Sequence, residues 1–138
     1  MLRMQNKNSK LRTAAADELQ KLQGKWQQIE CEANGVKNPP EEYGAQPIST
    51  FTRDTFVVTR ADGTIVIRGT FSLDPTRQPK AIDWTDTFGA DAGKTFPAIY
   101  TLDEQRFIFC ASDEGQPRPT EFRTQDGQVL RILQRMPQ

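Results

Sequence analysis

The chain has no histidine, only two cysteines and no excess of either charge. Without histidine it lacks the usual general base near neutral pH and the commonest protein ligand of transition metals. Eighteen basic residues balance eighteen acidic ones, so the clustered positive charge of a nucleic-acid-binding protein is missing. We therefore expect no metal, no cofactor and no nucleic-acid partner.

Long hydrophobic runs are also missing. No segment approaches the roughly 20 apolar residues that span a bilayer, and the basic residues 1–16 have no apolar stretch like that of a secretory signal. We therefore expect no membrane span, no export and a cytoplasmic location. Residues 1–16 are predicted to form a flexible basic arm, with contact to an acidic partner or a membrane surface as the alternative.

The two cysteines, Cys31 and Cys110, are too few for a disulfide scaffold or a thiolate metal cluster. Both stand in segments with alternating apolar residues. Because an unpaired cysteine behaves as a small hydrophobic side chain, we expect buried free thiols. A single disulfide is the alternative, and it requires that their two strands lie side by side.

With 138 residues the chain is long enough for one globular domain, which we place at residues 17–138. The pattern in Ala14–Gly24 predicts a short helix, because Leu19 and Leu22 share one side and a glycine follows its end. After this glycine the apolar period changes to two. Eight strands are predicted, each bounded by turn-forming residues: Lys25–Ala33, Ile48–Thr52, Thr55–Arg60, Thr64–Leu73, Lys80–Phe88, Pro97–Leu102, Arg106–Ala111 and Val129–Arg135.

Several connections between these strands are short enough to require hairpins. Arg53-Asp54, Ala61–Gly63 and Asp103–Gln105 each join two predicted strands, so sequential strands are antiparallel neighbours. Closing such a meander into a barrel removes its exposed edges. The predicted fold class is therefore all-β, an eight-stranded antiparallel up-and-down barrel with a short N-terminal helix. The longer connections, expected at the rims, are Asn34–Pro47, Asp74–Pro79, Gly89–Thr95 and Ser112–Pro119.

Alternation along the strands predicts which side chains face the barrel interior, which is either packed solid or able to hold one small ligand. The inward set comprises Ile65, Ile67, Gly69, Phe71 and Leu73 of one strand, and Ile82, Trp84 and Phe88 of the next. The strand at Arg106–Ala111 is apolar on both faces. Its outer face is therefore expected to be covered, with the short helix as the candidate cover.

The junction of the helix and the first strand, Gly24-x-Trp26, resembles the lipocalin signature. This resemblance implies that Gly24 lets the chain turn into the barrel and that Trp26 closes the barrel floor. It also implies a basic residue of the last strand, Arg135 or Arg131, over the indole ring as a cation–π partner.

The chain as a whole resembles a more specific group, an uncharacterised lipocalin-like domain family known chiefly from Planctomycetes. The resemblance runs from Asp17 to Arg135. It departs from the usual family pattern at Ala98 and at the turn Asp103–Gln105, where the family has glycine. The family implies a lipocalin-like barrel and no activity. Its motifs here are Leu19-x-x-Leu22-x-Gly24-x-Trp26, Gly69-Thr70-Phe71, Leu73-Asp74-Pro75, Pro79–Asp83, Gly93-Lys94-Thr95, Ile99-Tyr100, Leu102, Cys110-Ala111, Arg118-Pro119, Phe122 and Arg135.

Two functions of different classes follow from this fold. The leading hypothesis is a non-catalytic, lipocalin-like module that binds a small apolar or amphipathic ligand in the barrel interior or mouth. The second is a protein–protein interaction domain, an inhibitor or immunity-type partner with a solid barrel core. The candidate ligand-binding residues are Phe71, Trp84, Tyr100, Phe109 and Arg118.

Arg118 differs from the other four candidates because it stands between two prolines, which stiffen the backbone on both sides. Its guanidinium is predicted either to reach a ligand carboxylate or phosphate over the barrel mouth or to form an internal salt bridge with Asp113, Glu114 or Glu121. Asp83 is expected to be solvated, or else to lie near a rim and bind Lys80, Lys94 or Arg118.

No group of residues predicts catalysis. Asp83 and Asp86 lie three apart on a predicted strand, so they point to opposite faces and do not by themselves form an acid–base pair. Cys110 has no histidine to lower its thiol pKa. Gly93-Lys94-Thr95 resembles the end of a phosphate-binding loop, but Gly89 stands one residue too close and a strand follows. We therefore expect no enzymatic activity.

Overall fold

The computed structural model describes residues 14–40 and 43–137. Of the basic arm predicted at residues 1–16, residues 1–13 lie outside the described part of the chain. Residues 14–22 form a helix. The strands that follow are β1 (Gly24–Ala33), β2 (Val36–Lys37), β3 (Ile48–Thr52), β4 (Thr55–Thr59), β5 (Ile65–Asp74), β6 (Ala81–Phe88), β7 (Thr95–Leu102), β8 (Arg106–Ser112) and β9 (Gln128–Arg135).

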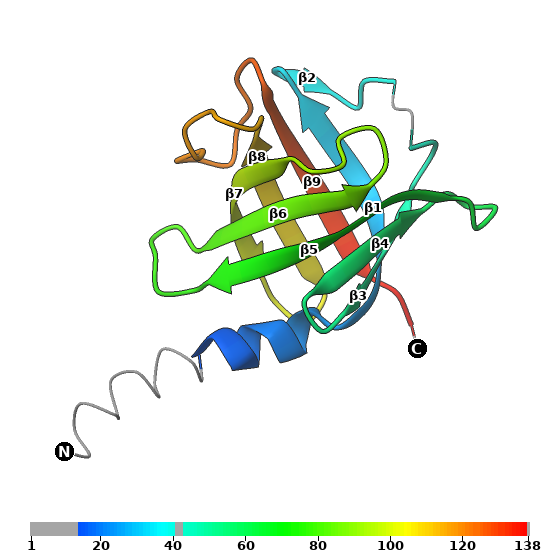
Figure 1. The fold of residues 1–138 in the computed structure, drawn as a ribbon, viewed down its shortest axis with the longest axis horizontal. Coiled ribbons are helices and arrows are strands. Elements are labelled where there is room, and N and C mark those ends of the chain that lie inside the picture. The colour runs from blue at the N-terminus through cyan, green and yellow to red at the C-terminus, as the bar shows by residue number, and fades with distance from the viewer. Residues whose placement is uncertain (1–13, 41–42, 138) are drawn as a thin grey trace.

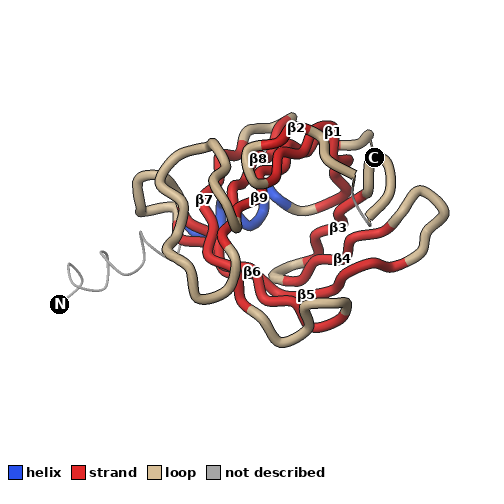
Figure 2. Tube along the Cα trace, turned by 90° about the horizontal axis from the view of Figure 1, so that it is seen from above, coloured by secondary structure: helices blue, strands red, loops and turns tan. Residues whose placement is uncertain are grey.

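The strands form one antiparallel sheet that closes on itself. Each of β4 to β9 pairs with the strand before it, β3 pairs with the first half of β1, and β9 returns to pair with β1. This last ladder runs from Trp26 opposite Arg135 to Ala33 opposite Val129. Figure 2 shows the resulting ring of strands. The predicted eight-stranded up-and-down barrel is therefore confirmed, with every strand within two residues of its predicted bounds and the short β2 added.

The two ends of the barrel differ. The helix lies across one end (Figure 1), which we call the closed end; three short connections, at residues 53–54, 75–80 and 103–105, return there. Because consecutive strands run antiparallel, the remaining connections all lie at the opposite end, which we call the open end. Three of the four predicted long loops are there, and only Asp74–Pro79 is at the closed end.

Trp26 forms the floor of the barrel at the closed end. Its side chain is completely buried, and its Nε1–H donates to the Leu22 carbonyl oxygen at 2.9 Å. The Arg135 guanidinium lies 4.2 Å from the indole ring centre and donates to the Gln23 carbonyl at 2.9 Å. The cation–π contact expected of Arg135 or Arg131 is thus made by Arg135. Gly24 has a φ of +106°, which favours glycine at the entry to β1.

Aromatic side chains fill the half of the barrel next to this floor. Phe51 contacts the rings of Phe71 and Phe107 with centres 5.6 and 5.8 Å apart. The predicted inward face of β5 is confirmed where Gly69 and Phe71 are buried between exposed neighbours. The closed half of the barrel is therefore a packed core.

The inward prediction for Phe88 is wrong. Its side chain is 49% exposed, and the Arg68 guanidinium lies 5.4 Å from its ring centre on the outside of the barrel. The β5–β6 ladder shifts register between Arg68 and Gly69. This irregularity ends the simple alternation before the strand itself ends.

A second, smaller apolar cluster lies on the outer side of β7, β8 and β9. Its buried members are Ile99, Cys110 and Leu130. The expectation that the helix covers this face is wrong, because the helix lies at the closed end. The loop between β8 and β9 approaches instead, where the Cys110 Sγ is 3.9 Å from the Arg123 carbonyl oxygen. Cys31 and Cys110 are both buried thiols, and no disulfide joins them, as predicted.

Candidate functional site

A cavity of about 230 Å³ lies in the half of the barrel next to the open end. All eight barrel strands contribute to its wall, and Tyr43, Asp91 and Asp113 reach it from the loops at this end. The wall is mainly apolar, with the aromatic side chains Phe51, Phe56, Trp84, Phe96 and Phe109. The aliphatic residues Val58, Ile67, Val129 and Leu133 also contribute.

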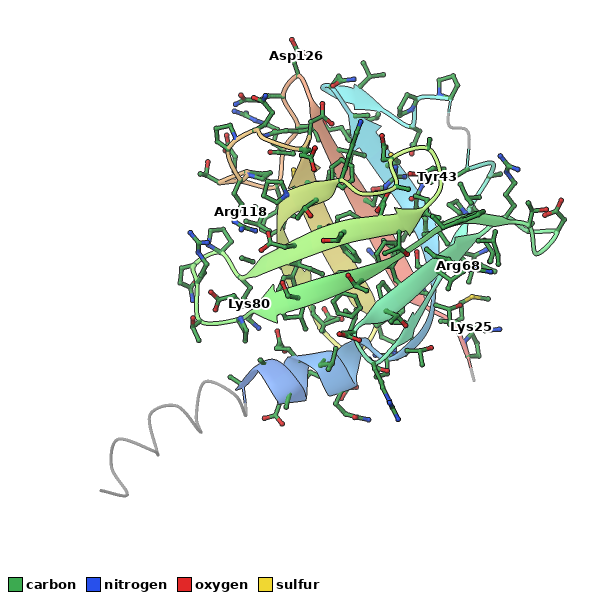
Figure 3. The ribbon with its side chains drawn as sticks, viewed as in Figure 1. Lys25, Tyr43, Arg68, Lys80, Arg118 and Asp126 are labelled. Atoms are coloured by element: carbon green, nitrogen blue, oxygen red, sulfur yellow. The ribbon has the colours of Figure 1, made fainter. Side chains whose placement is uncertain are left out.

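Polar side chains gather at the mouth of this cavity. Arg131 donates from Nη1 to the Gln28 Oε1 at 2.9 Å, and its guanidinium lies 4.7 Å from the Tyr43 ring centre. Asp91 forms a salt bridge of 3.1 Å with Lys94. Figure 3 shows Tyr43 near the β6–β7 loop at the open end. The arginine of the mouth is thus held against the wall by two neighbouring side chains.

Asp86 lies deeper and is almost fully buried, with 7% exposure. It stands two residues after Trp84 on β6, and the pleat of the strand directs both side chains inward. No hydrogen bond or salt bridge to its carboxylate comes from the described residues. Burial, together with the nearby charge of Asp91, raises the pKa of Asp86 to about 6.

Trp84 also lines the cavity, and its indole contains a second polar group without a partner. Its Nε1 is buried and has no hydrogen-bond partner among the residues that the structure describes. The ring packs against Phe109 and Phe56, with centres 4.8 and 5.1 Å away. A buried donor without an acceptor costs about 1–3 kcal/mol. Because protein atoms cover this indole N–H, the unpaired polar group that lines the cavity is the Asp86 carboxylate.

A smaller hollow of about 110 Å³ adjoins the cavity on the side of β5 and β6. Asp86 and Tyr43 belong to both walls, and Arg60 faces only the smaller one. No salt bridge joins Asp86 to Arg60 or to Arg131. Asp86 therefore lies where the two spaces meet, with neither arginine as its counter-ion.

Two of the five residues predicted to bind a ligand line the cavity, namely Trp84 and Phe109. Phe71 packs beneath them, with its ring centre 5.7 Å from that of Trp84, but it does not form part of the wall. Tyr100 is buried at the closed end and donates its hydroxyl hydrogen to the Glu18 Oε1 at 3.0 Å. The structure therefore separates the aromatic candidates into a cavity pair and a core pair.

Arg118 lies on the outside of the barrel and not at its mouth (Figure 3). It forms a salt bridge of 2.8 Å with Asp83 and donates to the Ala98 carbonyl at 2.8 Å. Of the alternatives stated for Arg118, the internal ion pair is therefore observed, and Asp83 is its partner instead of the acidic residues near Arg118 in sequence. The pair fastens the β8–β9 loop to β6 and β7.

A buried polar group closes the other end of the barrel. Glu18 of the helix accepts hydrogen bonds from Lys80 at 2.8 Å and from Tyr100. Burial raises the pKa of Glu18, but these bonds and the charges of Lys80 and Lys21 outweigh it and hold the pKa below its usual value. Burial and the same carboxylate raise the pKa of Tyr100. This arrangement anchors the helix across the closed end of the barrel.

Sequence reasoning missed Asp86, Tyr43 and Arg131 as residues of the site. A signal for Asp86 was present, because it shares the inward parity of Trp84 and a charged residue on an inward face is unusual. Tyr43 had no such signal, since it belongs to a long loop. Arg131 was considered only as a partner for Trp26, but it stands opposite Cys31 on β1, whereas Arg135 stands opposite Trp26.

Within residues 14–40 and 43–137, no three histidine, cysteine or acidic side chains group together so that they could hold a metal ion. Burial and the charge of Glu32 raise the pKa of the Cys110 thiol to about 11, so it is protonated near neutral pH. In the same part of the chain, no helix has the length and hydrophobicity needed to cross a membrane.

Comparison of the chain with protein-family models, with curated proteins and with solved structures gives no significant match. The site must therefore be interpreted from its own geometry.

Replacing Asp86 with asparagine is expected to stabilise the protein at pH 7–8 and to have little effect near pH 4. The folded state raises the carboxyl pKa from about 3.9 to about 6, so it favours the protonated form. The free energy of unfolding therefore has its full value below about pH 4 and decreases as the pH rises to about 6. The Asp86→Asn variant avoids this decrease, so its free energy of unfolding is expected to exceed that of the natural protein by about 2–3 kcal/mol at pH 7–8.

Urea unfolding at both pH values measures this difference. Asp126→Asn is the matched control, because it removes the same charge from an exposed loop residue, and we expect it to change stability by less than about 0.5 kcal/mol. An Asp86→Asn variant that is no more stable than the natural protein at pH 8 would contradict the assignment of an unpaired buried carboxylate.

Proposed function

We propose that the protein is a non-catalytic binding module for a small apolar or amphipathic ligand, held in the cavity at the open end of the barrel. We further propose that it is related to the lipocalin-like domain family that its motifs resemble. The observation that carries the first proposal is the aromatic cavity of about 230 Å³, which opens between rim loops at one end of the barrel. Small-molecule sites are usually apolar concavities with a few polar groups.

The size of the cavity limits the ligand to a single ring or a short chain. An apolar cavity of about 150 Å³ can hold benzene, so 230 Å³ accommodates one ring with a small substituent. The Asp86 carboxylate supplies a hydrogen-bond acceptor in the wall. An amphipathic ligand therefore suits the cavity better than a pure hydrocarbon does.

The alternative function, a protein-interaction domain, was linked to a barrel packed solid throughout. Only the closed half, around Phe51, Phe71 and Phe107, is packed in that way. The open half has an accessible cavity instead. This contrast supports a small ligand over a protein partner as the occupant of the site.

The test is binding of toluene and benzyl alcohol by the full chain, measured by isothermal titration calorimetry and by tryptophan fluorescence. Of the two tryptophans, only Trp84 lines the cavity, so binding is expected to change its emission. We expect millimolar or tighter dissociation constants for at least one of the two probes. Replacing Val58 with phenylalanine fills the cavity from β4 and is expected to weaken binding at least about tenfold.

Val57→Phe is the matched control for this substitution. Val57 precedes Val58 on β4 and points to the other face of the sheet, so the same added volume stays outside the cavity. We expect Val57→Phe to bind the probes as the natural protein does. Failure of both probes to bind the natural protein, or equal binding by the two phenylalanine variants, would overturn the proposed function.

A further inference from the structure

The cavity has a charge asymmetry that its size and apolar walls do not explain. Among the residues that the structure describes, three acidic residues line it, Asp86, Asp91 and Asp113, against one arginine, Arg131. Asp91 is paired with Lys94 outside the cavity, and Arg131 is bound to Gln28 and packed on Tyr43. Asp86 is the most deeply buried of the three carboxylates, and no described residue donates to it or pairs with it.

Leaving such a carboxylate unpaired is costly. A buried charge is tolerated when a counter-ion or hydrogen-bond donors compensate for the lost hydration. Near neutral pH most Asp86 carboxyls are ionised, since burial and Asp91 raise the pKa only to about 6. The folded protein therefore presents a negative charge at the inner wall of an otherwise apolar space, and a ligand that brings a positive charge regains the missing interaction.

The remainder of the wall also suits a cation. Trp84 stands on the same inward face as Asp86, and Phe56 and Phe109 pack against its ring. Aromatic faces attract ammonium groups, and the attraction increases when water is excluded. The aromatic ring and the carboxylate together form the two parts of a site for an apolar amine.

We propose that the ligand of this cavity is a small primary amine with an apolar body, whose ammonium group pairs with the Asp86 carboxylate while its body lies among the aromatic side chains. This inference rests on the proposed function, because it names the chemical class that the cavity takes. An anionic ligand would meet three carboxylates. A neutral ligand of the same shape can donate a hydrogen bond to Asp86 but brings no counter-charge.

Three probes of similar size separate these cases: benzylamine, benzyl alcohol and benzoate. At about pH 8 we expect benzylamine to bind at least about tenfold more tightly than benzyl alcohol, because its ammonium group adds a charge-assisted hydrogen bond to the Asp86 carboxylate. Benzoate is expected to bind most weakly. Calorimetry on the full-length natural protein measures all three affinities.

The Asp86→Asn variant identifies the residue responsible. It is expected to lose the preference for benzylamine and to keep its affinity for benzyl alcohol, since the shape of the wall is retained. The control Asp126→Asn removes an equal charge at the tip of a loop (Figure 3) and is expected to keep the preference. Because the asparagine variant is expected to fold more stably than the natural protein, loss of binding cannot be attributed to unfolding.

Lowering the pH from about 8 to about 5 adds an independent measurement. Protonation of Asp86 is expected to weaken benzylamine binding several-fold and to leave benzyl alcohol binding unchanged. In the described part of the chain, the other charged or titratable groups around Asp86 are Tyr43, Arg60 and Asp91, with Asp113 and Arg131 elsewhere in the cavity wall. The asparagine variant separates their contribution, because any pH dependence that it retains arises from these groups.

The outcomes distinguish this inference from the function on which it rests. Equal binding of the amine and the alcohol, tighter binding of benzoate, or an amine preference that survives in Asp86→Asn would each overturn the amine assignment and leave the binding cavity in place. If benzylamine, benzyl alcohol and toluene all fail to bind, both proposals are overturned.

Discussion

Replacing Trp26 with alanine is expected to lower the free energy of unfolding by about 3–5 kcal/mol, the range for removing a buried tryptophan or phenylalanine. Trp26 is completely buried, packs edge-on against Phe107 with ring centres 6.1 Å apart, and donates to the Leu22 carbonyl. The substitution also removes the ring beneath Arg135 and leaves a cavity where the helix meets the barrel floor. Urea denaturation followed by circular dichroism measures the loss.

Phe122→Ala is the control for Trp26→Ala, because it removes an aromatic side chain that is 36% exposed. We expect this change to cost about 1 kcal/mol or less. Since small domains are stable by only about 5–15 kcal/mol, the Trp26 variant loses a large fraction of the total. A cost below about 2 kcal/mol for Trp26→Ala would mean that the floor is not the structural element described above.

Replacing Gly69 with alanine is expected to destabilise the protein by about 3 kcal/mol, the upper end of the usual cost of over-packing. A Cβ at this position would lie 2.2 Å from the Thr85 carbonyl oxygen and 2.6 Å from the Phe56 ring. Phe56 stands directly opposite Gly69 in the β4–β5 ladder. Relief of the clash therefore requires movement of β6 backbone as well as of a buried ring. Thermal and urea unfolding measure the effect.

Gly63→Ala provides the comparison for Gly69→Ala. Gly63 has a φ of +88° but no atom within 4 Å of the added Cβ, so alanine there costs only the backbone strain of a left-handed conformation, about 1 kcal/mol. The Gly69 variant is expected to be clearly less stable than the Gly63 variant. The reverse order would show that the close approach of Thr85 and Phe56 relaxes at little cost.

The experiments on the site and those on the fold address different halves of the barrel. Trp26 and the Glu18 group hold the closed end, whereas Asp86 and Trp84 line the cavity near the open end. Loss of the floor is expected to reduce stability, while loss of the Asp86 charge is expected to increase it. This opposition is typical of a functional group kept at the expense of stability.

The sequence alone was sufficient for the strands, the hairpins and the closure of the barrel. A period of two and turn-forming residues at each boundary are local properties, and they predicted every barrel strand within two residues. Closure followed because an antiparallel meander of eight strands otherwise leaves two unpaired edges. The same local rule explains the error at Phe88, where a register shift interrupts the alternation.

The tertiary structure alone decided the composition of the candidate site. Asp86, Tyr43 and Arg131 come from β6, the long loop after β2, and β9, and only the curvature and register of the closed sheet bring them to one cavity. The same holds for Arg118, whose partner Asp83 is 35 positions earlier in the chain. Local periodicity predicts whether a side chain points into or out of the barrel, but it does not predict which distant side chain lies opposite it.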